Sequence, residues 1–358
     1  MKQFYPLSTF LTEYSEKNGV NAYRPVAVGR YGIRTRESIY SKELAKDYSK
    51  NKLIHKNTLT VGMGSVQIDI GVLTDDITYS VSPAYHTYKI AGVNAEYLRY
   101  CLECRNQDMF SRFVKRGSRQ GKTIDLKRWM TYEIPVYDEN RQQEIVDRLN
   151  RISELIEKRQ EQLVQLSELV KSRFIELFGV YPSNPKGWET ATIRDIVADV
   201  RYGSSRPAVD GGKYPYLRMN NITYGGELNL TDTKRIDIPD NELDKCTVRR
   251  GDVLFNRTNS KELVGKTCVY NRDEMMVLAG FVIRVRVTER VLPEFLSAFL
   301  NTDFSKQMLL GMCKAAIGQA NINAQEMQNI GIYLPPTELQ RQFVQFKAVS
   351  YTHLTLPT

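Results

Sequence analysis

Residues 139–178 read ENRQQEIVDRLNRISELIEKRQEQLVQLSELVKSRFIELF, a run that contains neither glycine nor proline. Apolar side chains recur along it every three or four residues, which is the heptad pattern of a coiled-coil helix. At 1.5 Å per residue such a helix would be about 60 Å long. Gly179 then favours a helix end, because glycine readily adopts the left-handed conformation found there. The apolar seam consists of Ile145, Leu149, Ile152, Ile156, Leu163, Leu166, Val170 and Leu177.

Two arginines, Arg159 and Arg173, interrupt this seam. Their aliphatic stems can pack along the helix while the guanidinium groups stay in water, which is the interpretation we favour. The alternative is that they set register and orientation, as a polar core residue does in a coiled coil. The helix is nearly neutral, with 7 basic and 8 acidic residues. We therefore predict that residues 137–179 form a spacer helix that binds another helix.

An internal repeat flanks this helix and appears when the chain is shifted by 198 residues. The register holds over some fifty residues without a gap, which chance matches would not do. The chain is therefore predicted to be a tandem duplication, with copy 1 at residues 1–136 and copy 2 at residues 180–335. The matching pairs are Val93–Leu98 with Val291–Leu296, Ile124–Asp125 with Ile322–Asn323, Ile134 with Ile332, Gln142 with Gln340, and Ile145–Val146 with Phe343–Val344.

Each copy is predicted to be an α+β unit with a curved, mostly antiparallel sheet. Runs of β-branched and aromatic residues bounded by glycine and asparagine predict the strands. Helices are expected over residues 96–114 and 293–311, the second with Pro293 in its first turn. The expected strands are residues 58–61, 66–70, 214–218, 252–255, 267–270 and 281–287.

The long helix is also expected to recur after copy 2. Residues 336–349 match its start, whereas residues 350–358, SYTHLTLPT, are β-branched, contain Pro357 and lack the heptad pattern. That tail resembles translated sequencing-adapter sequence, so we leave it out of the fold prediction. The second helix is expected to stop near Ala348, and the natural protein to be longer. A full second helix would run antiparallel to the first and cover its seam.

Charge and composition restrict the class of protein. The 358 residues include 50 Lys and Arg against 41 Asp and Glu, a net charge of +9 that favours a polyanionic partner. Cys101 and Cys104 stand at CxxC spacing, but no second pair or nearby histidine completes a zinc site, and five cysteines fit a reducing compartment. No apolar run reaches membrane-span length and no signal pattern opens the chain. We expect a cytoplasmic protein without metal or cofactor.

Sequence motifs of enzymes that act on nucleic acids are each incomplete. Gly265-Lys266-Thr267 ends like a phosphate-binding loop, but Ser260 stands where that loop needs glycine. Gly62-Met63-Gly64 lacks the third glycine of a dinucleotide fingerprint, because Gln67 occupies its place. The sequence contains neither the Asn-Pro-Pro or Asp-Pro-Pro motif of adenine methyltransferases nor the Glu-x-Lys motif of nucleases. No catalytic residue is therefore predicted.

Loops rich in basic and polar residues are the candidates for nucleic-acid contact. In copy 1, residues 115–122 hold four cations and two glycines without an acid, and in copy 2 the matching residues 314–321 offer amides. Guanidinium groups can reach phosphates or guanine O6 and N7, and amides can pair with adenine. An ordinary solvated loop is the alternative for each residue. The candidates are Arg34, Arg36, Lys115, Arg116, Arg119, Lys122, Ser204, Ser205, Arg206, Gln319 and Asn321.

Several segments, in this order and in duplicate, also resemble a known family, the specificity subunits of type I restriction-modification systems. The likeness covers nearly the whole chain and fails only at its end. No one segment is diagnostic alone. The segments are Phe174–Gly179, Gly187–Glu189, Val248–Phe255, Gly265–Lys266, Ile317–Ile322 and Ile332–Gln340.

This resemblance implies two target-recognition domains, each reading one half of a split, non-palindromic site in double-stranded DNA. It also implies methyltransferase (modification) subunits and ATP-dependent restriction subunits as partners, with the chemistry supplied by them. One alternative is the recognition region of a fused restriction-methylation enzyme, which a long N-terminal catalytic extension would mark. Another is a coiled-coil scaffold, which predicts no salt-dependent DNA binding.

Overall fold

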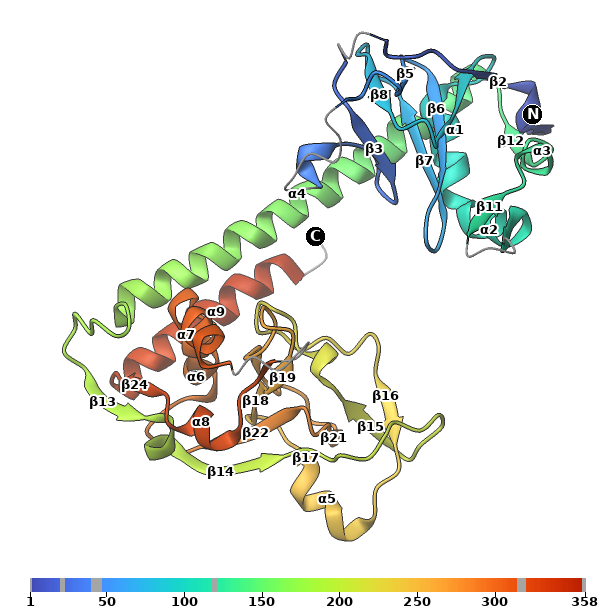
Figure 1. Ribbon diagram of the computed structural model, residues 1–358. Helices are drawn as coiled ribbons and strands as arrows, with labels where there is room; N and C mark the ends of the chain where they lie inside the picture. Colours follow the sequence, from blue (N-terminus) through green and yellow to red (C-terminus); the bar gives the residue numbers. More distant parts are fainter. Residues whose placement is uncertain (1, 20–22, 40–46, 117–120, 314–319, 356–358) are drawn as a thin grey trace. The chain divides into compact units, whose positions relative to one another are not determined.

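The computed structural model describes residues 2–19, 23–39, 47–116, 121–313 and 320–355, with the backbone alone at 116 and 351–355 (Figure 1). The chain divides into two compact units, unit 1 at residues 1–158 and unit 2 at residues 159–358. One uninterrupted helix, α4 (Glu139–Phe178), contributes its first half to unit 1 and its second half to unit 2. Both units combine helices with mostly antiparallel sheets, so the predicted α+β class is confirmed.

Unit 1 is built on a four-stranded antiparallel sheet in the order β2-β9-β6-β7, against which α1 and α2 pack. Its core is made of alternating strand residues such as Leu59 and Val61 together with Leu98, Met109 and Trp129. The elements are β1 (Gln3–Pro6), β2 (Leu11–Tyr14), β3 (Val26–Gly29), β4 (Gly32–Thr35), β5 (Lys52–Ile54), β6 (Thr58–Met63), β7 (Ile68–Leu73), β8 (Tyr79–Val81), β9 (His86–Ile90), α1 (Ala95–Cys104), α2 (Asn106–Phe113), β10 (Val114–Arg116), β11 (Lys122–Ile124), α3 (Leu126–Trp129) and β12 (Glu133–Val136).

Unit 2 contains two four-stranded sheets, ordered β14-β22-β18-β20 and β16-β15-β21-β17. The second sheet includes one parallel pair, β15 with β21. The elements are β13 (Glu189–Thr192), β14 (Val197–Tyr202), β15 (Tyr214–Leu217), β16 (Lys234–Ile236), α5 (Asp240–Cys246), β17 (Thr247–Val248), β18 (Val253–Asn256), β19 (Thr258–Asn259), β20 (Thr267–Val269), β21 (Met276–Leu278), β22 (Val282–Val287), α6 (Pro293–Leu300), α7 (Asp303–Met312), β23 (Ala320–Asn321), α8 (Ala324–Gln328), β24 (Gly331–Leu334) and α9 (Thr337–Thr355).

The predicted duplication is confirmed in the pairing of strands and in helix capping. Strand β1 pairs antiparallel with β12, and β13 pairs with β24 in the corresponding register. Asp125 and Asn323, which the shift of 198 residues aligns, both cap a short helix by accepting the backbone N–H of its third residue. Equivalent residues therefore perform the same structural task in both units.

Each long helix carries a buried glutamine in its first turn, and the two glutamines form equivalent hydrogen bonds. The amide nitrogen of Gln142 donates to Tyr137 O at 2.7 Å, and its oxygen accepts the Asn94 N–H at 2.9 Å. Gln340 donates to Pro335 O at 2.8 Å and accepts the Leu292 N–H at 2.8 Å. Each glutamine thus joins three elements: the end of β12 or β24, the start of α1 or α6, and the long helix. We call this arrangement the glutamine clasp.

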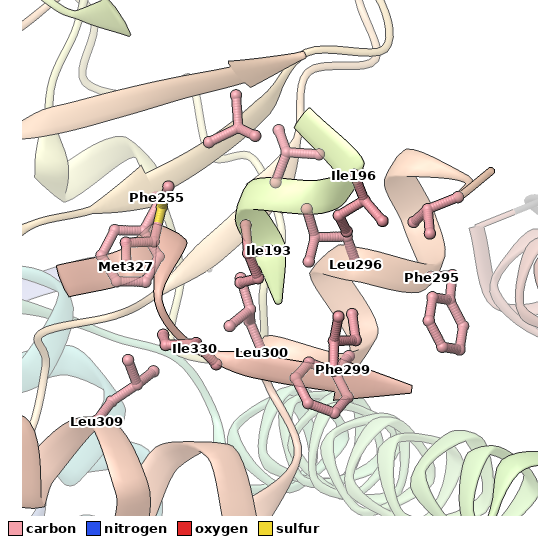
Figure 2. Packing of buried hydrophobic residues seen from close by; sticks show 14 of the residues in the cluster. Ile193, Ile196, Phe255, Phe295, Leu296, Phe299, Leu300, Leu309, Met327 and Ile330 are labelled. Carbon is pink, nitrogen blue, oxygen red and sulfur yellow. The ribbon is translucent and has the colours of Figure 1, made fainter. Parts of the chain in front are cut away.

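The second half of α4 packs into the core of unit 2 through aromatic residues. Phe174 and Phe178 contact Phe295 of α6 with ring centroids 5.5 and 4.9 Å apart, and Figure 2 shows Phe295 within this core. Phe178 also contacts Phe343 of α9, while Arg173, earlier in α4, lies 5.7 Å above the ring of Phe346. The two helices therefore run antiparallel, as predicted, and Arg173 packs on an aromatic ring.

The middle of α4 is exposed over residues 151–165. Its apolar seam residues Ile152, Ile156 and Leu163 are about half exposed, at 53%, 53% and 50%. Of the seam, Val170 is buried by its contacts within unit 2. The predicted heptad seam is thus present on a continuous helix. Its middle part is not buried against other described residues.

Three sequence predictions are wrong in detail. The helices expected over 96–114 and 293–311 are each broken in two, because Arg105 and Asn301 leave the helical conformation and Thr302 caps α7 by accepting the Ser305 N–H. Helix α9 continues through Thr355, past the expected stop near Ala348. β-Branched residues lower helix propensity by less than about 1 kcal/mol each, which does not end a helix already formed.

The glutamine clasp yields a stability prediction. Gln340→Met keeps the side-chain volume but leaves the Leu292 N–H and the Pro335 carbonyl without their partner, so we expect the free energy of unfolding to fall by about 1–3 kcal/mol. Gln342→Met, at an exposed position of the same helix, is the matched control. Urea denaturation measures both, and equal stability of the two variants would contradict the proposed importance of the clasp.

Candidate nucleic-acid interface

A groove of about 480 Å³ lies at one end of the sheets in unit 2. Three arginines, Arg206, Arg218 and Arg257, contribute to its wall, together with Phe281, which is 51% exposed. Among the described residues that line it, none is aspartate or glutamate. The small residues Ala279 and Gly280 also line the groove.

The predicted triplet Ser204, Ser205 and Arg206 lies on this groove, but its members differ in environment. Ser204 is buried, and its hydroxyl accepts the Arg206 N–H at 3.2 Å. We therefore assign Ser204 to shaping the loop, whereas Ser205 and Arg206 are exposed. The Arg206 guanidinium forms a two-bonded pair with Glu242 at 2.7 and 3.2 Å, and this pair holds the pKa of Glu242 below its usual range.

Arg257 occupies the link between β18 and β19. Its guanidinium carbon lies 4.9 Å from the ring centroid of Tyr202, a cation–π contact. The predicted residue Asn321 is exposed and lies opposite Thr258 in the β19–β23 ladder. The structure thus brings Asn321 to the strand that follows Arg257.

Phe281 stands directly before β22, and its backbone is fixed on one side. Its carbonyl oxygen accepts the Arg257 N–H at 3.0 Å and the side-chain amide of Asn256 at 3.2 Å. Asn256 is fully buried. The exposed ring therefore projects from a rigid backbone.

In unit 1, the candidates Arg34 and Arg36 belong to the β3–β4 hairpin and the short turn that follows it. Arg34 is exposed and lies 5.1 Å from the ring centroid of Tyr31, which Arg30 approaches at 5.7 Å. Arg36 lies 5.1 Å from the ring of Tyr48. The hairpin therefore presents an exposed aromatic ring, Tyr31 at 69%, between two cations.

Lys115 and Lys122 lie on the second candidate hairpin, β10–β11. Lys115 pairs with Asp125 at 2.8 Å, which lowers the pKa of that carboxyl, and Lys122 donates to the Ser65 carbonyl and lies 5.2 Å from the Phe110 ring. Exposed ion pairs of this kind contribute only about 0–1 kcal/mol, so Lys115 can exchange its partner for another anion. Arg119 and Gln319, and the side chain of Arg116, lie outside the described residues.

The sequence analysis missed Arg218, Arg257 and Phe281. None belongs to a basic cluster or a glycine loop; the available signal was their place at the end or start of a predicted strand. Conversely, Lys266 of the incomplete phosphate-loop motif is buried, and its amine donates to the Met219 carbonyl at 2.9 Å. Lys266 therefore has a structural role.

The described part of the chain holds neither a membrane-spanning helix nor a metal-binding cluster. Within it, no helix is both long enough and apolar enough to cross a bilayer. Likewise, these residues contain no group of three or more His, Cys, Asp and Glu placed to hold a metal ion. All five cysteines are free thiols.

Comparison with known proteins identifies relatives over both copies of the repeat. Residues 11–166 and 185–347 match the model of a family described as the type I restriction modification DNA specificity domain. The specificity subunit of the type I restriction enzyme EcoKI of Escherichia coli K12 is 24% identical over 184 residues, 50% of this chain. The specificity subunit assigned to the type I restriction enzyme MjaX of Methanocaldococcus jannaschii is 27% identical over 165 residues, 45% of this chain. Each alignment spans 39% of the relative's own length.

Two solved structures have a fold similar to that of this chain. The type I restriction-modification S subunit from M. genitalium has a TM-score of 0.54 at 13% identity. A chain from a structural study of complex assembly and conformational transition of the type I R-M system has a TM-score of 0.52 at 17% identity. Both likenesses cover 99% of this chain and 90% of the other. With the family model matching most of its length, the chain belongs to the type I restriction-modification DNA specificity family.

Proposed function

We propose that the chain is the sequence-reading component of a type I restriction-modification complex, in which each unit reads one part of a bipartite target in double-stranded DNA. The observation that carries this proposal is the groove of unit 2, whose described lining contains three arginines and an exposed ring but no carboxylate. Two units with different surfaces on one chain suit an asymmetric target. Family membership supports the same function.

We further propose that the chain is not itself an enzyme and that its partners are methyltransferase (modification) subunits and ATP-dependent restriction subunits. The incomplete phosphate-loop and dinucleotide motifs, and the lack of methyltransferase and nuclease motifs, support this division. The exposed seam of α4, with Ile152, Ile156 and Leu163, offers an apolar strip of the kind that binds a partner helix. The fused restriction-methylation enzyme is the second candidate.

Selection from a random DNA pool tests the recognition function. We expect the enriched sequences to share two conserved blocks separated by an unconserved spacer of fixed length. Absence of enrichment, or a single continuous palindrome, would overturn the proposal. Methyl transfer from S-adenosylmethionine by the purified chain alone would favour the fused-enzyme candidate.

The β10–β11 hairpin yields a prediction about salt. If Lys115 and Lys122 contact phosphates, replacing both by alanine should flatten the dependence of log K on log salt concentration by roughly 0.9 per lost contact. The loss should be similar on all sequences, because phosphate contacts carry no sequence information. Lys158→Ala, on the exposed middle of α4, is the control and should leave the slope unchanged. Equal slopes for wild type and the double variant, from fluorescence anisotropy, would rule out this role.

The pair between Arg206 and Glu242 yields a gain-of-binding prediction. Glu242→Gln releases the guanidinium at the rim of the groove, so DNA affinity at low salt should rise roughly threefold to tenfold. Asp244→Asn, at an exposed position of the same helix α5, removes an equal charge without touching Arg206 and should change affinity less. An equal rise in both variants would show that only net charge matters.

A further inference from the structure

Arg257 differs from the other two arginines of the unit 2 groove in its ionic partners. Arg206 is paired with Glu242 at 2.7 Å, and Arg218 with Asp232 at 2.9 Å. For Arg257, the described residues provide no carboxylate partner within ion-pair distance. A half-buried guanidinium without a counter-ion is unfavourable in a free protein, so its position suggests that an electron-rich group completes its environment when the protein is bound.

The backbone of Arg257 is fixed on both sides. Its N–H donates to Phe281 O at 3.0 Å, and its carbonyl accepts the Ile322 N–H at 2.9 Å. These two bonds tie the residue to the start of β22 and to the strand segment after Asn321. The side chain therefore starts from a well-defined point at the mouth of the groove.

Tyr202 provides an anchored aromatic neighbour for the guanidinium group. The ring lies 4.9 Å from the Arg257 guanidinium carbon, and the Tyr202 hydroxyl oxygen accepts the Ala324 N–H at 2.9 Å, at the first turn of α8. Arg257 Nε is buried and has no hydrogen-bond partner, so it faces away from solvent. The two terminal nitrogens are consequently the donors left to meet a ligand, and they form a planar fork.

A planar fork of two parallel N–H donors matches two acceptors in one plane. In double-stranded DNA the O6 and N7 atoms of guanine present such a pair in the major groove. A phosphate offers acceptors too, but a flexible lysine can reach a phosphate and needs no aromatic neighbour to hold it in place. Asn321 near the same strand adds an amide that can contact the neighbouring base.

We propose that Arg257, placed beside the ring of Tyr202, reads a guanine in the part of the DNA target that unit 2 recognises. Arg257 is the specificity-determining residue and Tyr202 its positioning residue. This inference rests on the proposed function, since it requires that unit 2 binds DNA. It adds a residue that the candidate loops of the sequence did not include.

Base substitution and amino-acid substitution together test the inference. The target is first determined for the wild-type full chain by selection from a random pool. Each guanine of the unit 2 block is then replaced by 7-deazaguanine, which pairs normally but lacks the N7 acceptor. At one position, wild-type affinity should fall, and Arg257→Ala should be insensitive to that replacement. On unmodified target Arg257→Ala should bind about fivefold to 150-fold more weakly than wild type.

Additional variants separate this role from a phosphate contact and from misfolding. Arg257→Lys keeps the charge but not the fork, so it should retain the salt slope and lose discrimination at the same base. Tyr202→Leu should produce the same base-specific loss, whereas Tyr224→Leu, which removes an exposed ring beside Lys306, should not. Thermal melting confirms that each variant is folded.

The outcomes distinguish this inference from the proposed function. If wild type selects no DNA, the proposed function fails and the inference with it. If wild type selects a bipartite target and Arg257→Ala selects the same one with the same 7-deazaguanine sensitivity, the inference alone is overturned. Equal weakening on every sequence with a flatter salt dependence would also overturn it, because Arg257 would then contact a phosphate.

Discussion

The arrangement of each unit depends on one buried amide. Gln142 and Gln340 each satisfy a strand-end carbonyl and a helix-start N–H at once, and both lie in the first turn of a long helix. A buried backbone group without a partner costs about 1–3 kcal/mol, so the three elements are favoured in a single relative position. The domain and the beginning of its helix are therefore joined as one body. A DNA-reading surface gains from this, because its side chains keep their place relative to the helix.

The groove of unit 2 also depends on hydrogen bonds that fix residues at the ends of strands. Backbone bonds hold Arg257 and Phe281 together, and Tyr202 is anchored to α8 through its hydroxyl. The side chains of Arg257 and Phe281 thus project from fixed strand ends. Arg206 is restrained by Glu242, and Arg218 by Asp232. Neither carboxylate is among the described residues that line the groove. A rigid set of donors favours direct recognition of base edges, since little conformational entropy remains to be lost on binding.

Much of the architecture could be predicted because it is periodic or repeated. The seam of α4 follows from its 3–4 spacing, and one shift of 198 residues aligns both glutamines and both helix caps. Residue-level details of the groove could not be predicted in this way. Whether Arg206 is paired with Glu242, or Arg257 lies beside the ring of Tyr202, depends on elements distant in sequence that only the fold brings together. The break between α6 and α7 was missed because the apolar spacing continues through Thr302, while the cap it forms is local.

The central claim is that two separable units on one chain each read their own part of a DNA target. Exchange of residues 180–335 for the corresponding region of a relative with a different target tests this most directly, with the methylated sequence mapped across a genome that expresses the complete complex. The account predicts that one half of the methylated site changes, and that the other half stays the same. A change in both halves, or in neither, would contradict it.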